Sequence, residues 1–353
     1  MQTQPGPTPD AAKPFLITMG DPAGIGPEII VKAFRNAPQE LARCVVMGDV
    51  ATLRRASREL GGVLPPVAEL ASLEGLASVP PRCIPVMQAC TLTTEVVPGQ
   101  VSGVAGRAAA ECIVAASRLA LSGKAAALVT APIHKEALAA AGEPFCAFPG
   151  HTEMLQAEAA AFVGKSIAQM PVRMMLANDE LRTVLVSIHV SLRDAIEAVT
   201  FGQVSATLRI THEFLLKALG RRPRIAVAGL NPHAGENGLF GTEERDVILP
   251  AVFAARQAGI DAEGPFAPDT VFMRARSTAR RAGEFDVVVA MYHDQGLIPV
   301  KYLGVEQGVN VTLGLPLLRT SPDHGTAFDI AGKNRADPSS LLAAIGMARR
   351  LAG

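Results

Sequence analysis

The chain has 353 residues, of which 49% are hydrophobic and only 4% aromatic, so we expect a large aliphatic core. A chain of this length usually forms two domains. Its 33 basic and 33 acidic residues give a formal net charge of zero. This balance excludes the basic surface that nucleic acids and anionic membranes require, and it favours a small-molecule ligand.

The five cysteines form no Cys-x-x-Cys pair, so we expect reduced thiols and a cytoplasmic location. Residues 1–13 are rich in Pro, Gln and Thr and lack the apolar stretch of a signal peptide, which predicts a disordered tail. No apolar run approaches the roughly 18 residues of a membrane helix, so no membrane partner is expected.

Short apolar runs alternate with stretches of helical spacing along the chain. The spacing predicts strands at 15–19, 43–48, 125–130, 183–187, 224–229, 285–291 and 309–313. It predicts helices from residue 27 and at 105–121, 195–219, 242–258 and 338–351. Prolines interrupt residues 64–98, which we leave unassigned. This alternation is typical of an α/β protein with a mostly parallel sheet covered on both faces.

Three histidines follow apolar strands by a few residues: His189, His233 and His293. Ligands of open α/β sheets bind beyond the carboxyl ends of the strands. If these three strands are neighbours, the imidazoles converge into an open site that suits Zn²⁺ or a similar divalent ion. The alternative is that each histidine is an ordinary turn or core residue.

Other polar residues are candidates for binding an anion. His151 and Thr152 precede a predicted helix, where they can cap the helix or bind a phosphate. Lys301, Asn310 and Arg319 lie in or beside apolar stretches, which suggests a carboxylate or phosphate partner. The alternative for the two cations is that they reach from a domain surface into solvent.

The sequence is ambiguous about a dinucleotide. Residues 24–29 begin like the Gly-x-Gly-x-x-Gly fingerprint, but Ile29 replaces the third glycine. A second candidate is the segment 323–333. Within this segment, the candidate cofactor-binding residues are polar or small: His324, Gly325, Thr326 and Asp329.

Taken together, these motifs resemble the 4-hydroxythreonine-4-phosphate dehydrogenase family of vitamin B6 biosynthesis. The matching segments are residues 17–28, 150–153, 229–236, 290–296, 308–316 and 319–327. The resemblance runs from about Phe15 to the C-terminus. It implies a fold similar to isocitrate and isopropylmalate dehydrogenases, with two α/β/α domains and a cleft between them, and a dinucleotide bound without the usual glycine fingerprint.

The resemblance also implies roles for the candidate residues. His189, His233 and His293 match metal ligands, while His151, Thr152, Lys301, Asn310 and Arg319 match substrate contacts. The metal is Zn, Mg, Mn or Co, the cofactor is NAD or NADP, and the partner is a second subunit that shares the active site. Asp269 and Asp294 are hypotheses for proton transfer or ligand orientation, and either can instead close a turn.

We expect three segments in the domain organisation. Residues 1–13 form the tail, residues 14–135 with 305–353 form a domain that binds the cofactor, and residues 136–304 form a domain with the metal ligands and the dimer interface.

The implied reaction is the NAD(P)- and metal-dependent oxidation of 4-phosphooxy-L-threonine to a β-keto acid, which decarboxylates to 3-amino-2-oxopropyl phosphate. Residues 154–170 and Phe148-Pro149 look more like paralogues that oxidise D-threonate or D-erythronate 4-phosphate or an aromatic-acid dihydrodiol. The remaining alternatives are a binding module without catalysis and a metal hydrolase or acyltransferase without nicotinamide.

Overall fold

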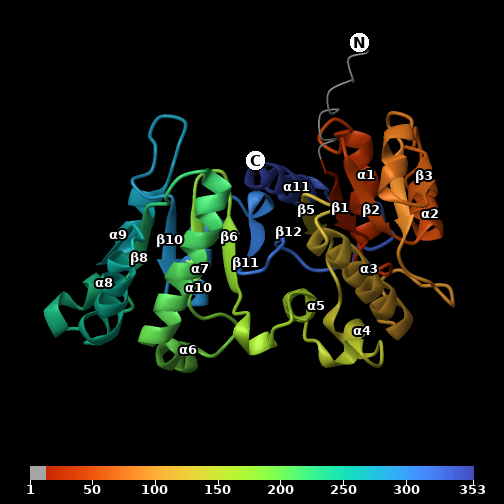
Figure 1. Cartoon of the computed structure of the whole chain (residues 1–353). Coiled ribbons are helices and arrows are strands. Elements are labelled where there is room, and N and C mark those ends of the chain that lie inside the picture. The colour runs from red at the N-terminus through yellow and green to blue at the C-terminus, as the bar shows by residue number, and fades with distance from the viewer. Residues whose placement is uncertain (1–12) are drawn as a thin grey trace, which may run out of the picture. The chain divides into compact units, whose positions relative to one another are not determined.

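The computed structural model describes residues 13–353 (Figure 1). The predicted tail therefore lies, except for Lys13, outside the described residues. The chain forms two compact units, one of residues 13–158 with 325–338 and the other of residues 159–324 with 339–353. In the part of the chain described, every helix is too short or too polar to span a membrane.

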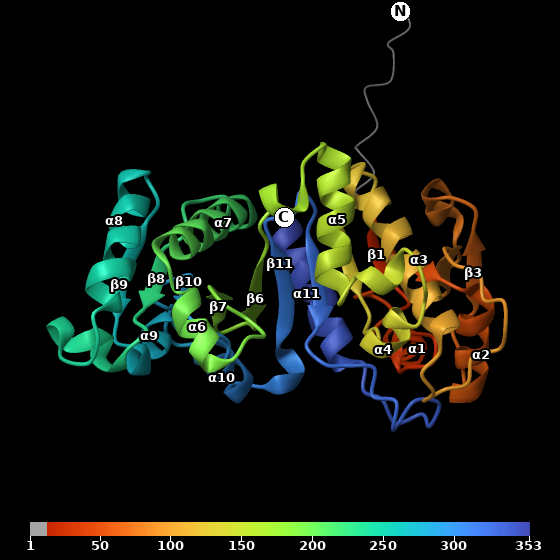
Figure 2. The same cartoon turned by 90° about the horizontal axis from the view of Figure 1, so that it is seen from below.

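The first unit contains a fully parallel sheet whose central strands are buried on both faces. Its strands are β1 (Phe15–Thr18), β2 (Cys44–Gly48), β3 (Val67–Leu70), β4 (Ile84–Gln88) and β5 (Ala127–Thr130), in the order β3-β4-β2-β1-β5. Its helices are α1 (Gly26–Asn36), α2 (Val50–Leu60), α3 (Gly103–Leu121), α4 (Lys135–Ala139) and the start of α5 (His151–Val163). Helices α1 and α2 lie on one face and α3 on the other, as right-handed crossovers require (Figure 2).

Local signals explain where these helices begin. Pro27 and Glu28 stand in the first turn of α1, where a missing N–H costs nothing and an acid faces the positive helix end. Asp49 caps α2 by accepting a hydrogen bond from the N–H of Thr52 at 2.7 Å. Ser102 caps α3 in the same way.

A buried ion pair on α1 holds the returning C-terminal segment of this unit. Glu28 and Lys32 are each 7% exposed and are joined at 2.8 Å. The Glu28 carboxylate accepts the N–H of Ala336 at 2.8 Å, and the Lys32 ammonium donates to the carbonyl of Ala336 at 2.7 Å. The segment 325–338 is thereby fixed to a helix some 300 residues earlier in the chain.

The second unit contains a mixed sheet. Its strands are β6 (Arg173–Ala177), β7 (Arg182–Leu185), β8 (Ile225–Ala228), β9 (Ala262–Phe266), β10 (Val287–Ala290), β11 (Val309–Leu313) and β12 (Arg319–Pro322), in the order β12-β11-β6-β7-β10-β8-β9. Strands β7, β10, β8 and β9 are parallel, whereas β6, β11 and β12 pair antiparallel. Its complete helices are α6 (Leu192–Ala198), α7 (Phe201–Leu219), α8 (Leu249–Gln257), α9 (Pro268–Ala275), α10 (His293–Tyr302) and α11 (Ser339–Ala352). Helices α7 and α10 cover opposite faces of the sheet (Figure 2).

Short helical turns complete the two units. They are η1 (Leu73–Ser78), η2 (Phe145–Ala147), η3 (Ile167–Gln169), η4 (Pro232–Gly238), η5 (Glu244–Ile248) and η6 (Val305–Gln307).

The predicted α/β class is confirmed, with two differences in detail. Residues 195–219 are mostly helical as predicted, but they lie in two helices, because the chain breaks at Val199 and Thr200 caps the new helix α7 by accepting a hydrogen bond from the N–H of Gln203. The compact units also differ from the expected ranges, because α11 packs on β11 and β12 and so belongs with the second unit. As folding domains, the expected ranges stay a prediction.

Candidate functional site

Two of the three selected histidines lie together in the second unit. His189 follows β7 and His293 begins α10 directly after β10, and these strands are parallel neighbours with Ala290 opposite Leu185. The ring centroids of the two imidazoles are 5.6 Å apart and inclined by 43°. Two imidazoles on one tetrahedral ion, with nitrogens at about 2.1 Å, would place their centroids about 5 Å apart. The observed spacing fits a shared ion.

Backbone contacts hold the loops that carry these histidines. The N–H of Val186 donates to the carbonyl of Ala290 at 2.9 Å, so the two strands remain paired to their carboxyl ends. Ser187 then donates twice to the carbonyl of Met291, from its N–H at 3.2 Å and from its hydroxyl at 2.9 Å. The loop carrying His189 is therefore fixed to the start of α10.

The orientation of His293 is set by its neighbour Asp294. Nδ1 of His293 lies 2.7 Å from Oδ1 of Asp294, and because a carboxylate only accepts, Nδ1 is the donor. This arrangement leaves Nε2 as the nitrogen with a lone pair for a metal. Both residues border a cavity of about 280 Å³ that also includes His189, Ser187 and Tyr292.

His233 occupies a different environment. It follows β8, which pairs with β10 as the sequence predicts, but it stands in a run of left-handed residues from His233 to Asn237 with φ between 42° and 78°. Its Nδ1 donates to Glu236 at 3.0 Å, and its ring meets the edge of Phe240. Successive non-glycine residues in this region are strained and are retained mainly where function demands them.

Glu244 holds the start of this strained segment, and sequence reasoning missed it. Its side chain is buried and accepts the N–H groups of Leu230 and Asn231, each at 2.7 Å, and the amide of Asn231 at 3.0 Å. Glu244 lies outside the motif 229–236, so that motif gave no reason to select it.

Residues 13–353 contain no group of three or more His, Cys, Asp or Glu side chains placed to hold one metal ion. His189 and His293 form a pair, and His233 does not border their cavity. A three-imidazole site within a single copy of the chain is therefore not found among the residues described.

The two candidate carboxylates differ in position. Asp294 contacts His293, and 71% of its side chain is exposed. Asp269 is exposed in the first turn of α9. Only Asp294 is thus placed beside the histidine pair.

The predicted substrate contacts of the second unit lie on or near its antiparallel strands. Asn310 and Thr312 lie two residues apart on β11 and so share one face with Arg319, which is opposite Thr312 on β12. Arg319 is 4% exposed and donates to the Thr312 hydroxyl at 3.1 Å. Lys301, in the last turn of α10, pairs with Asp323 at 2.7 Å. Three polar residues, one of them the buried cation Arg319, therefore face one side of the sheet.

The remaining predicted substrate contacts begin α5. His151 is the first residue of this helix and Thr152 the second. Nε2 of His151 lies 3.2 Å from the carbonyl oxygen of Ala131, so the ring contacts the loop that follows β5. A phosphate is well placed at such a helix start, where N–H groups lack helical partners.

The loop after β5 also contacts a buried acid that sequence reasoning did not select. Asp21 follows β1, is fully buried, and accepts the N–H of Ala23 at 2.8 Å. Burial raises its pKa to about 6, against the lowering effects of the hydrogen bond from Ala23 and of the nearby His134. Oδ2 of Asp21 and Nδ1 of His134 are both buried without a hydrogen-bond partner among the described residues. The imidazole of His134 stacks on Phe328, with centroids 4.5 Å apart.

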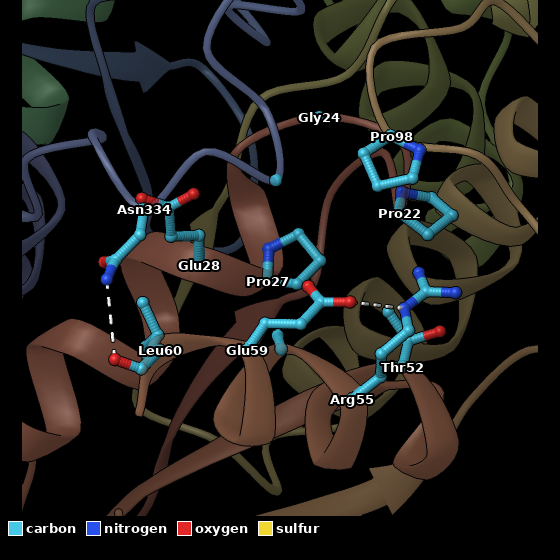
Figure 3. Close-up of a pocket in the computed structure, with 12 residues that line it drawn as sticks. Pro22, Gly24, Pro27, Glu28, Thr52, Arg55, Glu59, Leu60, Pro98 and Asn334 are labelled. Carbon is cyan, nitrogen blue, oxygen red and sulfur yellow. Dashed lines mark hydrogen bonds and ion pairs between the residues drawn. The ribbon is translucent and has the colours of Figure 1, made fainter. Parts of the chain in front are cut away.

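The predicted cofactor residues Gly325, Thr326 and Asp329 lie in the segment that contacts the glycine-containing loop after β1, and His324 directly precedes it. The N–H of Ile25 donates to the carbonyl of Thr326 at 3.1 Å, and a Cβ on Gly24 would lie 2.9 Å from the Cβ of Thr326. Gly24, Pro27 and Asn334 border a small pocket in the first unit (Figure 3). In this pocket the Asn334 amide contacts the Leu60 carbonyl at 3.4 Å.

Comparison with known proteins agrees with the motif resemblance. Residues 40–348 match the family described as pyridoxal phosphate biosynthetic protein PdxA. The chain is 52% identical over 339 residues to 4-hydroxythreonine-4-phosphate dehydrogenase of Beijerinckia indica, covering 96% of this chain and 95% of that protein. It is 45% identical over 343 residues to D-threonate 4-phosphate dehydrogenase of Salmonella typhimurium, covering 96% and 99%.

A solved structure is similar over nearly the whole chain. The crystal structure of 4-hydroxythreonine-4-phosphate dehydrogenase from Klebsiella pneumoniae superposes with a TM-score of 0.85 at 41% identity. The match covers 97% of this chain and 100% of that one.

Proposed function

Because this chain belongs to the family of pyridoxal phosphate biosynthetic protein PdxA, we propose that it oxidises 4-phosphooxy-L-threonine with NAD or NADP. The product is a β-keto acid that loses CO₂ to give 3-amino-2-oxopropyl phosphate. The observation that carries this proposal is the histidine pair, 5.6 Å apart, at the carboxyl ends of two parallel strands in a chain of this family.

A second substrate is D-threonate 4-phosphate, which is favoured by the 45% identity to the Salmonella typhimurium enzyme of that name. Both substrates carry a phosphate and a carboxylate on a short carbon chain, so the same cationic and amide groups can bind either one. They differ at the carbon next to the carboxylate, which bears an amine in one and a hydroxyl in the other. Initial rates with each compound, followed by the absorbance of the reduced cofactor, choose between them.

The metal site in this proposal consists of His189 and His293 with a third imidazole, His233, from a second copy of the chain. Neutral imidazoles suit Zn²⁺ and Co²⁺, whereas Mn²⁺ and Mg²⁺ would rely more on oxygen ligands. When bound, the ion supplies positive charge that stabilises negative charge developing on the substrate. Asp294 holds the ring of His293 with Nε2 available, and Asp269 remains the second candidate for proton transfer.

The proposed substrate contacts are cationic and polar side chains that suit a phosphate and a carboxylate. Arg319 and Lys301 supply positive charge for the phosphate or carboxylate, and Asn310 lies on the same sheet face as Arg319. His151 and Thr152 supply donors at the start of α5. An anion beside Arg319 would accept a charge-assisted hydrogen bond from this buried guanidinium, which also donates to the Thr312 hydroxyl.

The dinucleotide would bind along the segment that contains His324, Gly325, Thr326 and Asp329. Support comes from the pocket bordered by Gly24 and Asn334, and from the start of α1 at Gly26, whose positive end favours phosphate groups. Gly24 lets Thr326 approach closely, so this glycine serves the cofactor segment without the usual three-glycine fingerprint.

A homodimer that shares its active site is supported by exposed apolar side chains beside the histidine loops. Leu192, which borders the cavity of the histidine pair, is 61% exposed, and Leu239, which follows the His233 segment, is 71% exposed. Phe253, Met273 and Ile298 of the same unit are each more than 60% exposed. Exposed apolar side chains that gather into one patch are typical of a surface that another protein covers.

Mixing two inactive variants tests the metal site and the shared dimer together. We expect His189→Ala and His233→Ala each to lose activity alone. Refolded together, they should recover up to about a quarter of the wild-type rate, because half of the dimers are mixed and each mixed dimer has one intact site. His212→Gln, outside the proposed site, is the control and should remain active. An inactive mixture with normal dimer formation would contradict sharing.

A further inference from the structure

The largest hollow described in the first unit lies away from the proposed catalytic residues. It has a volume of about 860 Å³, within the size range of small-molecule sites. Its walls come from the segments just before β1, β2, β4 and β5 and from the turn η1. In a parallel sheet these segments all lie at the amino edge, opposite the carboxyl edge from which Asp21 and Ala131 extend.

Four cations line this amino-edge hollow, and each one precedes a parallel strand. Lys13 comes two residues before β1, Arg43 one before β2, Arg82 two before β4, and Lys124 three before β5. Since the strand order is β4-β2-β1-β5, the cations follow one another along the edge. The arrangement is thus set by the sheet itself.

These cations have few partners within the protein. All four are exposed, and within residues 13–353 none of their side chains forms an ion pair. Arg43 lies over the ring of Phe15, with its guanidinium carbon 5.7 Å from the centroid. Glu74 is the one acid in the lining, and its pKa is lowered chiefly by a hydrogen bond from the Ser72 side chain. The hollow therefore has an excess of positive charge.

The floor and one wall of the hollow are apolar. Phe34 and Leu41 are buried beneath it, and Leu73, Leu76 and Val79 on or next to η1 are only half-buried. No residue of η1 is fully buried. A flat apolar group placed between the floor and η1 would cover surface that the chain leaves in contact with water.

We propose that the amino-edge hollow is a second binding site, separate from the catalytic one, for a small organic anion with a flat apolar body. The apolar body packs between Leu41 and Leu76, and its carboxylate or phosphate group is held by Arg43 and Arg82. A strand of four or five residues spans about 15 Å, so a ligand here does not reach the residues at the carboxyl edge.

The test is to measure by calorimetry the affinity of the protein for 1-naphthyl phosphate. The affinities for 1-naphthol and for inorganic phosphate, which each represent one part of this probe, are measured for comparison. The full-length protein should bind 1-naphthyl phosphate at least tenfold more tightly than either of these two compounds. The double variant R43Q/R82Q and the single variant Leu76→Asp should each weaken that binding tenfold or more. The double variant R54Q/R58Q removes two exposed arginines of α2 in the same unit and should bind like the wild type.

The outcomes separate this site from the proposed dehydrogenase activity, because calorimetry needs no turnover. Unchanged binding in R43Q/R82Q, or binding of inorganic phosphate as tight as that of 1-naphthyl phosphate, would overturn the proposal. Dehydrogenase rates without added ligand should be the same in R43Q/R82Q and the wild type. A variant that binds weakly but is also misfolded is recognised by a lowered melting temperature, and Leu76→Asp then decides the question.

Discussion

Asp21 and His134 come from the loops that follow the adjacent parallel strands β1 and β5, and burial raises the pKa of the Asp21 carboxyl, whereas the proximity of His134 lowers it. The N–H of Asp21 donates to the carbonyl of Pro132, in the loop after β5, at 2.9 Å. The same loop contacts His151 on one side and Phe328 on the other. Asp21 thus helps to hold the loop after β5, which contacts both a predicted substrate-binding residue and the predicted cofactor segment.

Replacing Asp21 with Asn should change how stability depends on pH. Burial raises the pKa of Asp21 from 3.8 to about 6, so between these values the folded chain retains a proton that the unfolded chain has lost. The free energy of unfolding therefore falls as pH rises through this window, by about 3 kcal/mol. Urea unfolding at pH 4.5 and pH 7 should show a smaller fall for Asp21→Asn than for the wild type. The exposed Asp261→Asn should match the wild type, and equal falls in all three proteins would contradict the assignment.

Asp294 and Asp269 should respond differently to substitution. The side-chain NH₂ of Asn at position 294 can donate to Nδ1 of His293. This favours the tautomer with its proton on Nε2, which then has no lone pair for the metal. We expect Asp294→Asn to weaken Zn²⁺ binding by about 10- to 100-fold, whereas Asp269→Asn should leave metal affinity unchanged. Competition with a chromogenic chelator measures both. Equal affinities for the two variants would remove Asp294 from the metal site.

Gly24→Ala should act on the cofactor more than on the substrate. The new Cβ would lie 2.9 Å from the Cβ of Thr326, so the cofactor segment must shift. We expect the KM for the dinucleotide to rise about tenfold, with a KM for the hydroxy acid within about twofold of wild type. Gly202→Ala is a suitable control because its Cβ would meet nothing within 4 Å. A proportional rise in both KM values would indicate general disruption instead.

Asp286→Asn should destabilise the second unit, with a dependence on pH opposite in sign to that of Asp21→Asn. Although burial opposes it, hydrogen bonds from Arg221 and Arg224 hold the pKa of Asp286 well below its ordinary value of 3.8. Its contribution is present above pH 3.8 and is lost as pH falls below it. We expect a loss of about 2 kcal/mol at pH 7, discounted because both arginines are half exposed. Thermal unfolding at pH 7 and pH 3 should show the difference from wild type shrinking at the lower pH.

The sequence predicts the strands that matter most for the site. Apolar runs before His189, His233 and His293 do form the neighbouring strands β7, β8 and β10. The comparisons confirm the family and the dehydrogenase class, which short motifs such as 290–296 had indicated. These features can be predicted from the sequence because they depend on the local pattern of apolar and polar residues.

Features that depend on distant contacts were not predictable. The left-handed segment at His233 is held by Glu244, whose role appears only when the turn and η5 are folded together. Strand β12 has the sequence Arg-Thr-Ser-Pro and lacks an apolar run, because its pairing with β11 rather than its composition makes it a strand. The pKa of Asp21 likewise depends on burial that no local pattern reveals.

The division of the chain has a consequence for synthesis on the ribosome. The first compact unit includes residues 325–338, and Glu28 and Lys32 remain without their bonds to Ala336 until that part of the chain has emerged. The N-terminal half therefore cannot complete its own fold while the rest is being translated, unlike a domain encoded by one continuous stretch. In every nascent chain, Glu28 and Lys32 therefore lack their backbone partner at Ala336 until the segment 325–338 has been synthesised.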